Sequence, residues 1–165
     1  FAVNGMEGTA LGGEVAVEWA LPEEWGRIRG SYATTRIELK VDPGLEPTSE
    51  AVEGGTPAHQ MLLWASLNPL TNVQMDAILR FVDRISDRPD GAALLPYFEY
   101  LPHRKIPAYT QLDLRLEWQV SGEFGLSLVG QNLLGDHHPE SADLLMDTEP
   151  TRAQRGVYSS LIWSF

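Results

Sequence analysis

The sequence predicts an all-β protein: a segment of an antiparallel up-and-down transmembrane β-barrel with about seven long strands. First, apolar and polar residues alternate along several stretches, which is typical of strands that lie between an apolar and a polar environment. Second, short turns and long polar loops alternate strictly between these stretches. Third, each stretch has about ten residues or more, close to the 9–11 or so that a membrane strand needs, whereas soluble strands usually have about five or six.

The clearest alternation lies in residues 107–120. Its apolar positions are Leu112, Leu114, Leu116, Trp118 and Val120. Its polar positions are Gln111, Asp113, Arg115, Glu117 and Gln119. Residues 157–165 repeat the design less strictly and end at Phe165. Because successive side chains of a strand point to opposite faces, each of these stretches has one face suited to lipid and one suited to a polar barrel interior.

The other elements follow from the same alternation and from the turn residues between them. Seven strands are expected, at residues 12–21, 25–40, 58–68, 73–85, 107–120, 124–134 and 157–165. Residues 1–4 are expected to end a further, incomplete strand. Short turns are expected at residues 22–24, 69–72 and 121–123, and long polar loops at 41–57, 86–106 and 135–152. Alternation is imperfect in residues 25–40, and in residues 58–68 either Met61 and Leu63 or Leu62 and Trp64 can take the apolar side.

Aromatic residues gather near the strand ends that adjoin the short turns or the end of the chain. They are Trp19, Trp25, Trp118, Phe124, Trp163 and Phe165. Tryptophan and tyrosine form belts at membrane–water interfaces, so these residues are interface candidates. In bacterial outer-membrane barrels short turns are periplasmic and long loops are extracellular, which would place Phe165 at the periplasmic edge. The alternative is that these aromatics belong to the core of a soluble β-sandwich.

Composition excludes several classes of protein. The chain has 165 residues, of which 43% are apolar, near the average of soluble proteins, so this share alone does not reveal a membrane protein. A membrane barrel is compatible with that average, because only alternate residues face lipid. The sequence has no run of about 18 apolar residues, so no membrane-spanning helix is predicted. Cysteine is absent, which excludes disulfides and thiolate metal sites within this chain. The formal net charge of −11 argues against nucleic acid as a partner. The chain begins at Phe1 without a charged-then-apolar leader, which fits a mature protein or a fragment.

Asp113, Arg115, Glu117 and Gln119 are the candidates for a polar barrel interior. The three charged residues lie side by side on one face of a strand, where ion pairing in a wet lumen is a simpler interpretation than acid–base catalysis. No set of nucleophile, base and orienting residue can be assembled, so we expect neither an enzyme nor catalytic residues, and no cofactor.

Two loop clusters have weaker chemical signals. His137 and His138, with Glu140 and Asp143 nearby, are better interpreted as part of a solvated loop than as a metal site, because adjacent histidines point apart on an extended chain. Three basic residues that precede a strand could contact an anionic ligand or a lipopolysaccharide phosphate, but a solvated loop end is the simpler interpretation. They are His103, Arg104 and Lys105.

Three stretches resemble the TonB-dependent outer-membrane receptors. Residues 106–118, with the sequence Ile-Pro-Ala-Tyr-Thr-Gln-Leu-Asp-Leu-Arg-Leu-Glu-Trp, resemble a late-strand signature of that family. Residues 126–134 and 136–140 resemble its penultimate strand and final loop, and residues 155–165 resemble its closing strand with a terminal aromatic residue. The resemblance covers residues 106–165 well and residues 12–85 by pattern only.

The resemblance implies a 22-stranded barrel that is filled by an N-terminal plug and imports scarce nutrients such as iron–siderophore complexes or cobalamin. It also implies energy from the inner-membrane TonB complex, and a terminal Phe165 that is read by the barrel-assembly machinery. The chain departs from the family pattern because it contains neither a plug nor a TonB box. Residues 1–165 are therefore expected to be the C-terminal portion of the barrel.

The expected partners are outer-membrane lipid and lipopolysaccharide, the rest of the barrel and its plug, the TonB complex through the N-terminal part, and a small-molecule ligand such as a metal chelate. Two alternatives remain at this point. One is a small outer-membrane barrel with a structural or adhesive role and no transport. The other is a soluble β-barrel carrier.

Overall fold

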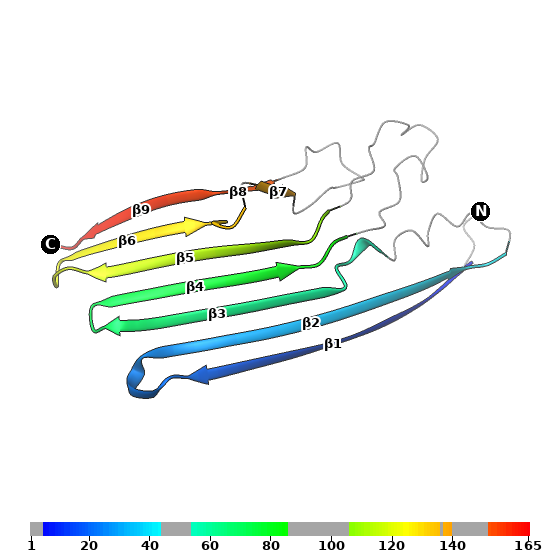
Figure 1. The fold of residues 1–165 in the computed structure, drawn as a ribbon, viewed down its shortest axis with the longest axis horizontal. Helices are drawn as coiled ribbons and strands as arrows, with labels where there is room; N and C mark the ends of the chain where they lie inside the picture. Colours follow the sequence, from blue (N-terminus) through cyan, green and yellow to red (C-terminus); the bar gives the residue numbers. More distant parts are fainter. Residues whose placement is uncertain (1–4, 44–53, 86–105, 136, 140–151) are drawn as a thin grey trace.

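The computed structural model describes residues 5–43, 54–85, 106–135, 137–139 and 152–165. Seven strands form one antiparallel sheet in the order β1-β2-β3-β4-β5-β6-β9 (Figure 1). They are β1 (Met6–Ala20), β2 (Gly26–Val41), β3 (His59–Leu70), β4 (Val73–Val82), β5 (Tyr109–Gln119), β6 (Phe124–Gln131) and β9 (Gly156–Trp163). A separate ribbon pairs β7 (His137–Pro139) with β8 (Arg152–Gln154). In the described part of the chain, the one helical element is the 3-10 turn η1 (Pro22–Glu24), and no helix is long and apolar enough to cross a membrane.

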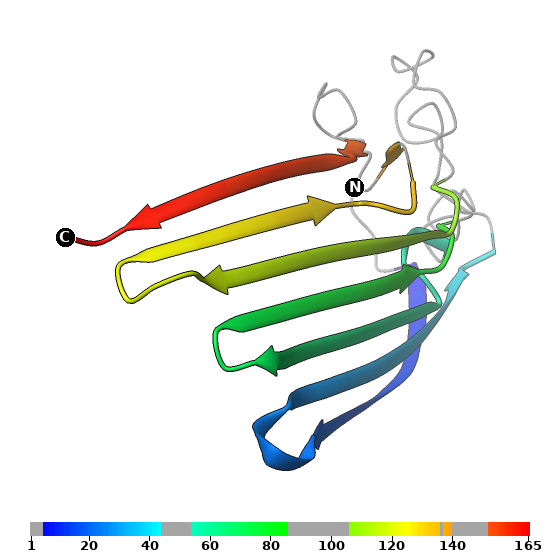
Figure 2. The ribbon, with the colours of Figure 1, turned by 60° about the vertical axis from the view of Figure 1, so that its left-hand side comes forward.

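The topology is a meander in which each long strand pairs with the next one along the chain. The short connections β1–β2, β3–β4 and β5–β6 lie at the same end of the sheet as the C-terminus, on the left of Figure 1. The strand ends that lead into the connections β2–β3, β4–β5 and β6–β9 lie at the opposite end of the sheet, and the β7–β8 ribbon lies between β6 and β9 in the sequence. Figure 2 shows that the seven strands form a single twisted and curved layer. The expected fold class, an up-and-down barrel segment with seven long strands, is confirmed.

Several element boundaries differ from the expected ones. β1 begins at Met6 rather than at residue 12, because its backbone pairs with β2 as far as Met6 opposite Val41 even though its small residues there give no apolar pattern. β3 continues to Leu70, so Pro69 lies in the strand and not in the turn. The register shifts between Leu67 and Leu70, and an irregularity of this kind accommodates a proline that cannot donate a hydrogen bond.

The remaining differences lie at the other strand ends. β4 ends at Val82, and Ile85 forms an isolated bridge with Ile106. β9 ends at Trp163, so Phe165 lies beyond the last strand. The expected stub at residues 1–4 lies outside the described residues, as do most residues of the loops expected at 41–57, 86–106 and 135–152.

β2 begins where only glycine fits. Gly26 has a φ of 137°, in the region that favours glycine. A Cβ atom added there would lie 2.0 Å from the backbone oxygen of Ser66 on β3. This close approach brings the end of the first hairpin against β3, so that pairing starts with Gly26 opposite Leu67.

The sheet has almost no core of its own. Among the described residues, only Gly5, Ile106 and Asn132 are buried, and the last two have 3% and 1% of their surface exposed. Large apolar side chains are instead exposed along the whole sheet, among them Val17 at 63% and Leu161 at 60%. The terminal strands β1 and β9 each pair on one side only. A layer with an exposed apolar face and two open edges requires partners for its edge strands and cover for its apolar face to be stable.

Candidate functional site

The strand register divides the sheet into two faces. Leu114 lies opposite Ala77, which lies opposite Ala65. Ala65 in turn lies opposite Ile28, and Ile28 opposite Trp19. Directly paired residues of antiparallel strands share a face, so this row marks an apolar face that runs across β1 to β5. The positions between these residues define the polar face.

The register also settles the two ambiguous strands. On β3, Met61 and Leu63 lie on the apolar face, opposite Phe81 and Leu79 respectively. Trp64 lies on the polar face, and it is less exposed than Met61 and Leu63. On β2 the apolar pattern changes its phase along the strand. Ile28 and Tyr32 lie on the apolar face, whereas Ile37 and Leu39 have the opposite parity, and this change explains the imperfect alternation.

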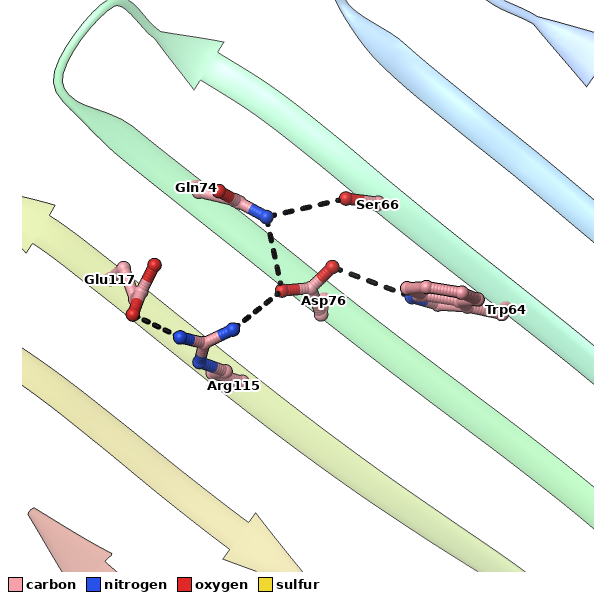
Figure 3. Close-up of polar contacts among 6 residues, drawn as sticks. All are labelled: Trp64, Ser66, Gln74, Asp76, Arg115 and Glu117. Carbon is pink, nitrogen blue, oxygen red and sulfur yellow. Dashed lines mark hydrogen bonds and ion pairs between the residues drawn. The ribbon is translucent and has the colours of Figure 1, made fainter.

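A network of polar contacts occupies the centre of the polar face, and Asp76 on β4 lies at its middle (Figure 3). The Asp76 carboxylate accepts hydrogen bonds from Trp64 Nε1 at 3.4 Å and from Gln74 Nε2 at 3.3 Å. Arg115 Nη1 lies 3.7 Å from its Oδ2 atom and also pairs with Glu117. Only 10% of the Asp76 side chain is exposed, and these partners supply the hydrogen bonds that a polar group at that burial requires.

The network continues onto β2 and β1. The Arg29 guanidinium lies 5.2 Å from the centre of the Trp64 ring, a cation–π arrangement. The same arginine pairs with Glu18 through its Nε atom at 2.5 Å. Glu18, Arg29, Trp64, Asp76 and Arg115 therefore form one continuous line of polar contacts across five strands, which we call the polar row.

The four residues expected to face a barrel interior all lie on the polar face, but they have different surroundings. Arg115 and Glu117 pair with each other, and Glu117 lies opposite Gln74. Gln119 is near the short turn, where its Nε2 donates to the backbone oxygen of Ser121. Asp113 takes no part in the polar row. It contacts the bend that follows β6, which alternation alone does not indicate.

The bend after β6 is formed by Asn132. Its backbone N–H donates to Asp113 Oδ1 at 2.8 Å, and its side-chain Nδ2 donates to the backbone oxygen of Ala153 at 3.1 Å. Sequence reasoning did not single out Asn132. It also did not single out Arg29, Trp64 or Asp76 as a connected group, because they lie on three different strands whose register is not visible in the sequence.

The aromatic candidates lie near the short-turn end of the sheet. Trp19, Trp118 and Trp163 have the parity of the apolar face and are 63%, 45% and 67% exposed. Trp25 follows η1 and is 55% exposed. Phe165 is fully exposed and packs edge-on against Trp163, with 6.4 Å between the ring centres.

The two loop clusters contribute little to the described structure. His137 lies opposite Gln154 in the β7–β8 ribbon. Glu140 and Asp143 lie outside the described residues, as does the basic cluster of His103, Arg104 and Lys105. Within the described ranges, no group of three or more histidine, aspartate or glutamate side chains is placed to hold a metal ion.

The fold, one antiparallel sheet of seven long strands, is that of a β-barrel segment. The chain is similar to the closed form of the ferric-catecholate import receptor Fiu from E. coli K12, with a TM-score of 0.60 and 11% identity over 94% of this chain. It is similar to the open form of the same receptor with a TM-score of 0.54 and 13% identity over 94% of this chain.

The chain spans about a quarter of the length of these receptor chains, namely 27% and 26%. At such low identity the likeness shows the fold alone. No family model and no curated protein matches the sequence. Both similar structures are import receptors for ferric catecholates.

Proposed function

We propose that this chain is the C-terminal part of the barrel of a TonB-dependent outer-membrane receptor that imports a small-molecule metal chelate. The observation that carries the proposal is the single-layer sheet with one exposed apolar face, one polar face and two open edges. In the complete receptor, neighbouring barrel strands cover the edges of β1 and β9. Without such neighbours, open strand edges in lipid would leave backbone groups unpaired.

The apolar face is the lipid-facing side of the barrel in this proposal. The extent of this face along the strands is indicated by β2, where the residues at the apolar-face positions change from uncharged to charged. From Gly26 to Thr34, the apolar-face positions of β2 carry no charge. Thr34 lies opposite His59, the first residue of β3. Beyond Thr34 these positions are Arg36, Glu38 and Lys40, and Arg36 forms an exposed ion pair of 2.6 Å with Glu38. Charged residues return where a strand leaves the membrane, so the outer rim lies between Thr34 and Arg36.

The aromatic residues mark the other rim. Trp19, Trp118 and Trp163 have the parity of the apolar face near the short turns, where an interfacial belt is expected. With the orientation usual for bacterial outer-membrane barrels, these turns and Phe165 are periplasmic and the long connections are extracellular. Lipid and the lipopolysaccharide of the outer leaflet are then partners of the apolar face.

The polar face lines the interior of the barrel. The polar row gives this wall paired charges and few unpartnered groups, which suits contact with water and with a polar plug domain. A plug that precedes this segment in the receptor, and a TonB complex in the inner membrane that acts on it, complete the transport unit. The small non-transporting barrel is not favoured, because 94% of the chain aligns with part of a much longer receptor.

The experiment uses the full-length receptor. It is produced in a bacterium that lacks its own ferric-chelate receptors, in strains with and without functional TonB. We expect outer-membrane fractionation of the protein and uptake of at least one radiolabelled chelate from a panel of catecholate, hydroxamate and corrinoid complexes, lost in the strain without TonB. A correctly inserted receptor that takes up none of the panel, or takes it up equally without TonB, would contradict the proposal.

A further inference from the structure

Asn132 is the most buried side chain that the structure describes, at 1% exposure, in a sheet that otherwise buries very little. It follows the last residue of β6 and has a φ of 51°. Positive φ is uncommon outside glycine, and asparagine is one of the few residues that tolerate it. A buried polar residue with this backbone conformation at the end of a strand indicates a bend that specific contacts hold in place.

The bend joins three elements through Asn132. Its backbone N–H donates to Asp113 Oδ1 on β5 at 2.8 Å, and its side-chain Nδ2 donates to the backbone oxygen of Ala153 at 3.1 Å. Ala153 is the middle residue of β8 and lies opposite His138. The side chain of Asn132 therefore attaches the β7–β8 ribbon to the wall of the sheet.

Asp113 supplies the acceptor that the bend requires. The regular β5–β6 pairing ends with Leu114 opposite Gly130, and Leu133 donates one further backbone hydrogen bond to Leu112 at 2.9 Å. The N–H of Asn132 turns to the Asp113 carboxylate instead of a backbone carbonyl. Gln111 Nε2 donates to both oxygens of that carboxylate, at 3.1 and 3.0 Å, and so fixes its orientation. Charge-assisted hydrogen bonds of this kind are stronger than those between neutral groups.

Small residues allow the chain to fold back at this place. A Cβ atom at Gly130 would lie 3.0 Å from Leu133 Cδ2, so the Leu133 side chain packs directly over the Gly130 backbone. A Cβ atom at Gly135 would lie 3.5 Å from Asn132 Oδ1, so the chain also passes close to the Asn132 amide on its way to β7. The chain therefore stays close to the bend from Gly130 to Gly135.

We infer that Asn132 and Asp113 are positioning residues that hold the β7–β8 ribbon, the base of the connection between β6 and β9, against the barrel wall. The attachment itself rests on the contacts above. That the attached connection stands at the extracellular mouth of a receptor rests on the proposed function. Loss of the attachment should free this connection and leave the long strands paired.

The test is amide hydrogen exchange of the full-length receptor in detergent micelles, followed by peptides that cover residues 137–139 and 152–156. The variants are Asn132→Gly, which keeps a residue that tolerates positive φ but removes the bond to Ala153, and Asp113→Ala, which removes the acceptor. The matched control is Glu117→Ala, on the same strand and face but without contact to the bend. We expect exchange in the ribbon to become at least about fivefold faster in both variants and to stay unchanged in the control.

A localised effect separates positioning from general stability. Peptides from β1 to β4 should exchange as in the unchanged receptor, and Asn132→Gly should leave the β5–β6 pairs protected. The inference is overturned if ribbon exchange is already unprotected in the unchanged receptor, if neither variant alters it, or if protection falls equally in all strands. Because no ligand is involved, these outcomes are independent of the uptake experiment. If Asp113→Ala fails to fold, Gln111→Ala should give a smaller rise in ribbon exchange, since it removes only the support of the carboxylate.

Discussion

Leu114 and Arg115 are neighbours on β5, yet their side chains lie on opposite faces of the sheet. Leu114 is 43% exposed in a row of apolar residues and has no polar contact among those described. Arg115 has a similar side-chain exposure of 46%, but it pairs with Asp76 and Glu117. Exposure therefore does not distinguish these two residues, whereas pairing does. The polar face gains stability from polar partners within the sheet, whereas the apolar face lacks such partners among the described contacts and contacts lipid in the proposed receptor.

The largest effect on folding free energy is expected when the difference between the two faces is removed at Leu114. Leu114→Arg places a charge on the proposed lipid-facing side at mid-strand, where an arginine costs about 2–4 kcal/mol of membrane-folding free energy. Arg115→Leu, its matched partner on the polar face, should cost less, because it removes a partly exposed ion pair while Trp64 and Gln74 still donate hydrogen bonds to Asp76. The measurement is folding of the full-length receptor into liposomes, followed as a function of urea concentration. Equal costs for the two variants would mean that the two faces have been assigned to the wrong environments.

The next effect concerns the centre of the polar row. Asp76→Asn should lower the free energy of unfolding by about 1–3 kcal/mol, because it removes charge-assisted contacts from a group that is largely buried. Glu18→Gln is the control at the exposed end of the same row, where the side chain is 47% exposed. An exposed ion pair is worth about 0–1 kcal/mol, so this variant should be nearly neutral. Similar losses from both would show that the row has no buried centre.

The smallest effect on stability is expected at Phe165. Its ring is fully exposed beyond β9 and touches Trp163, so deletion should cost the refolded receptor less than about 1.5 kcal/mol, the lower end for burying such a side chain. If Phe165 is also the terminal signal for barrel assembly, deletion should lower the amount assembled in cells severalfold. Outer-membrane levels are compared with stability after refolding in liposomes. Normal levels in cells would leave the residue only its packing role.

The wall of the sheet was largely predictable, because a period of two fixes the facing of a strand from its own residues. β5 and β9 have the predicted faces for that reason. Trp64 was not assignable, because a large aromatic residue on a polar face makes sense only beside Arg29 and Asp76, which come from other strands. The start of β1 was not predicted from the sequence, for a different reason. Gly8 has no side chain that can show a pattern, and its pairing with Leu39 on β2 holds it in the strand.

The bend at Asn132 was not predictable from periodicity. Its positive φ, its burial and its bond to β8 depend on contacts between segments far apart in the sequence. The part of β2 beyond Thr34 was difficult to predict for a related reason. The pattern of β2 changes its phase beyond Thr34, where β3 no longer pairs with it, because the surroundings of the strand change there and not its conformation.

The most direct test of the two-faced wall is an accessibility scan along β5. A nitroxide label is placed in turn at residues 111–118 of the full-length receptor in bilayers, and its collision rates with oxygen, which is enriched in lipid, and with a water-soluble nickel chelate are measured. Labels at Leu112, Leu114 and Leu116 should favour oxygen, and labels at Asp113, Arg115 and Glu117 should favour the chelate, in strict alternation. A scan without a period of two, or with the opposite phase, would contradict the assignment of the apolar face to lipid.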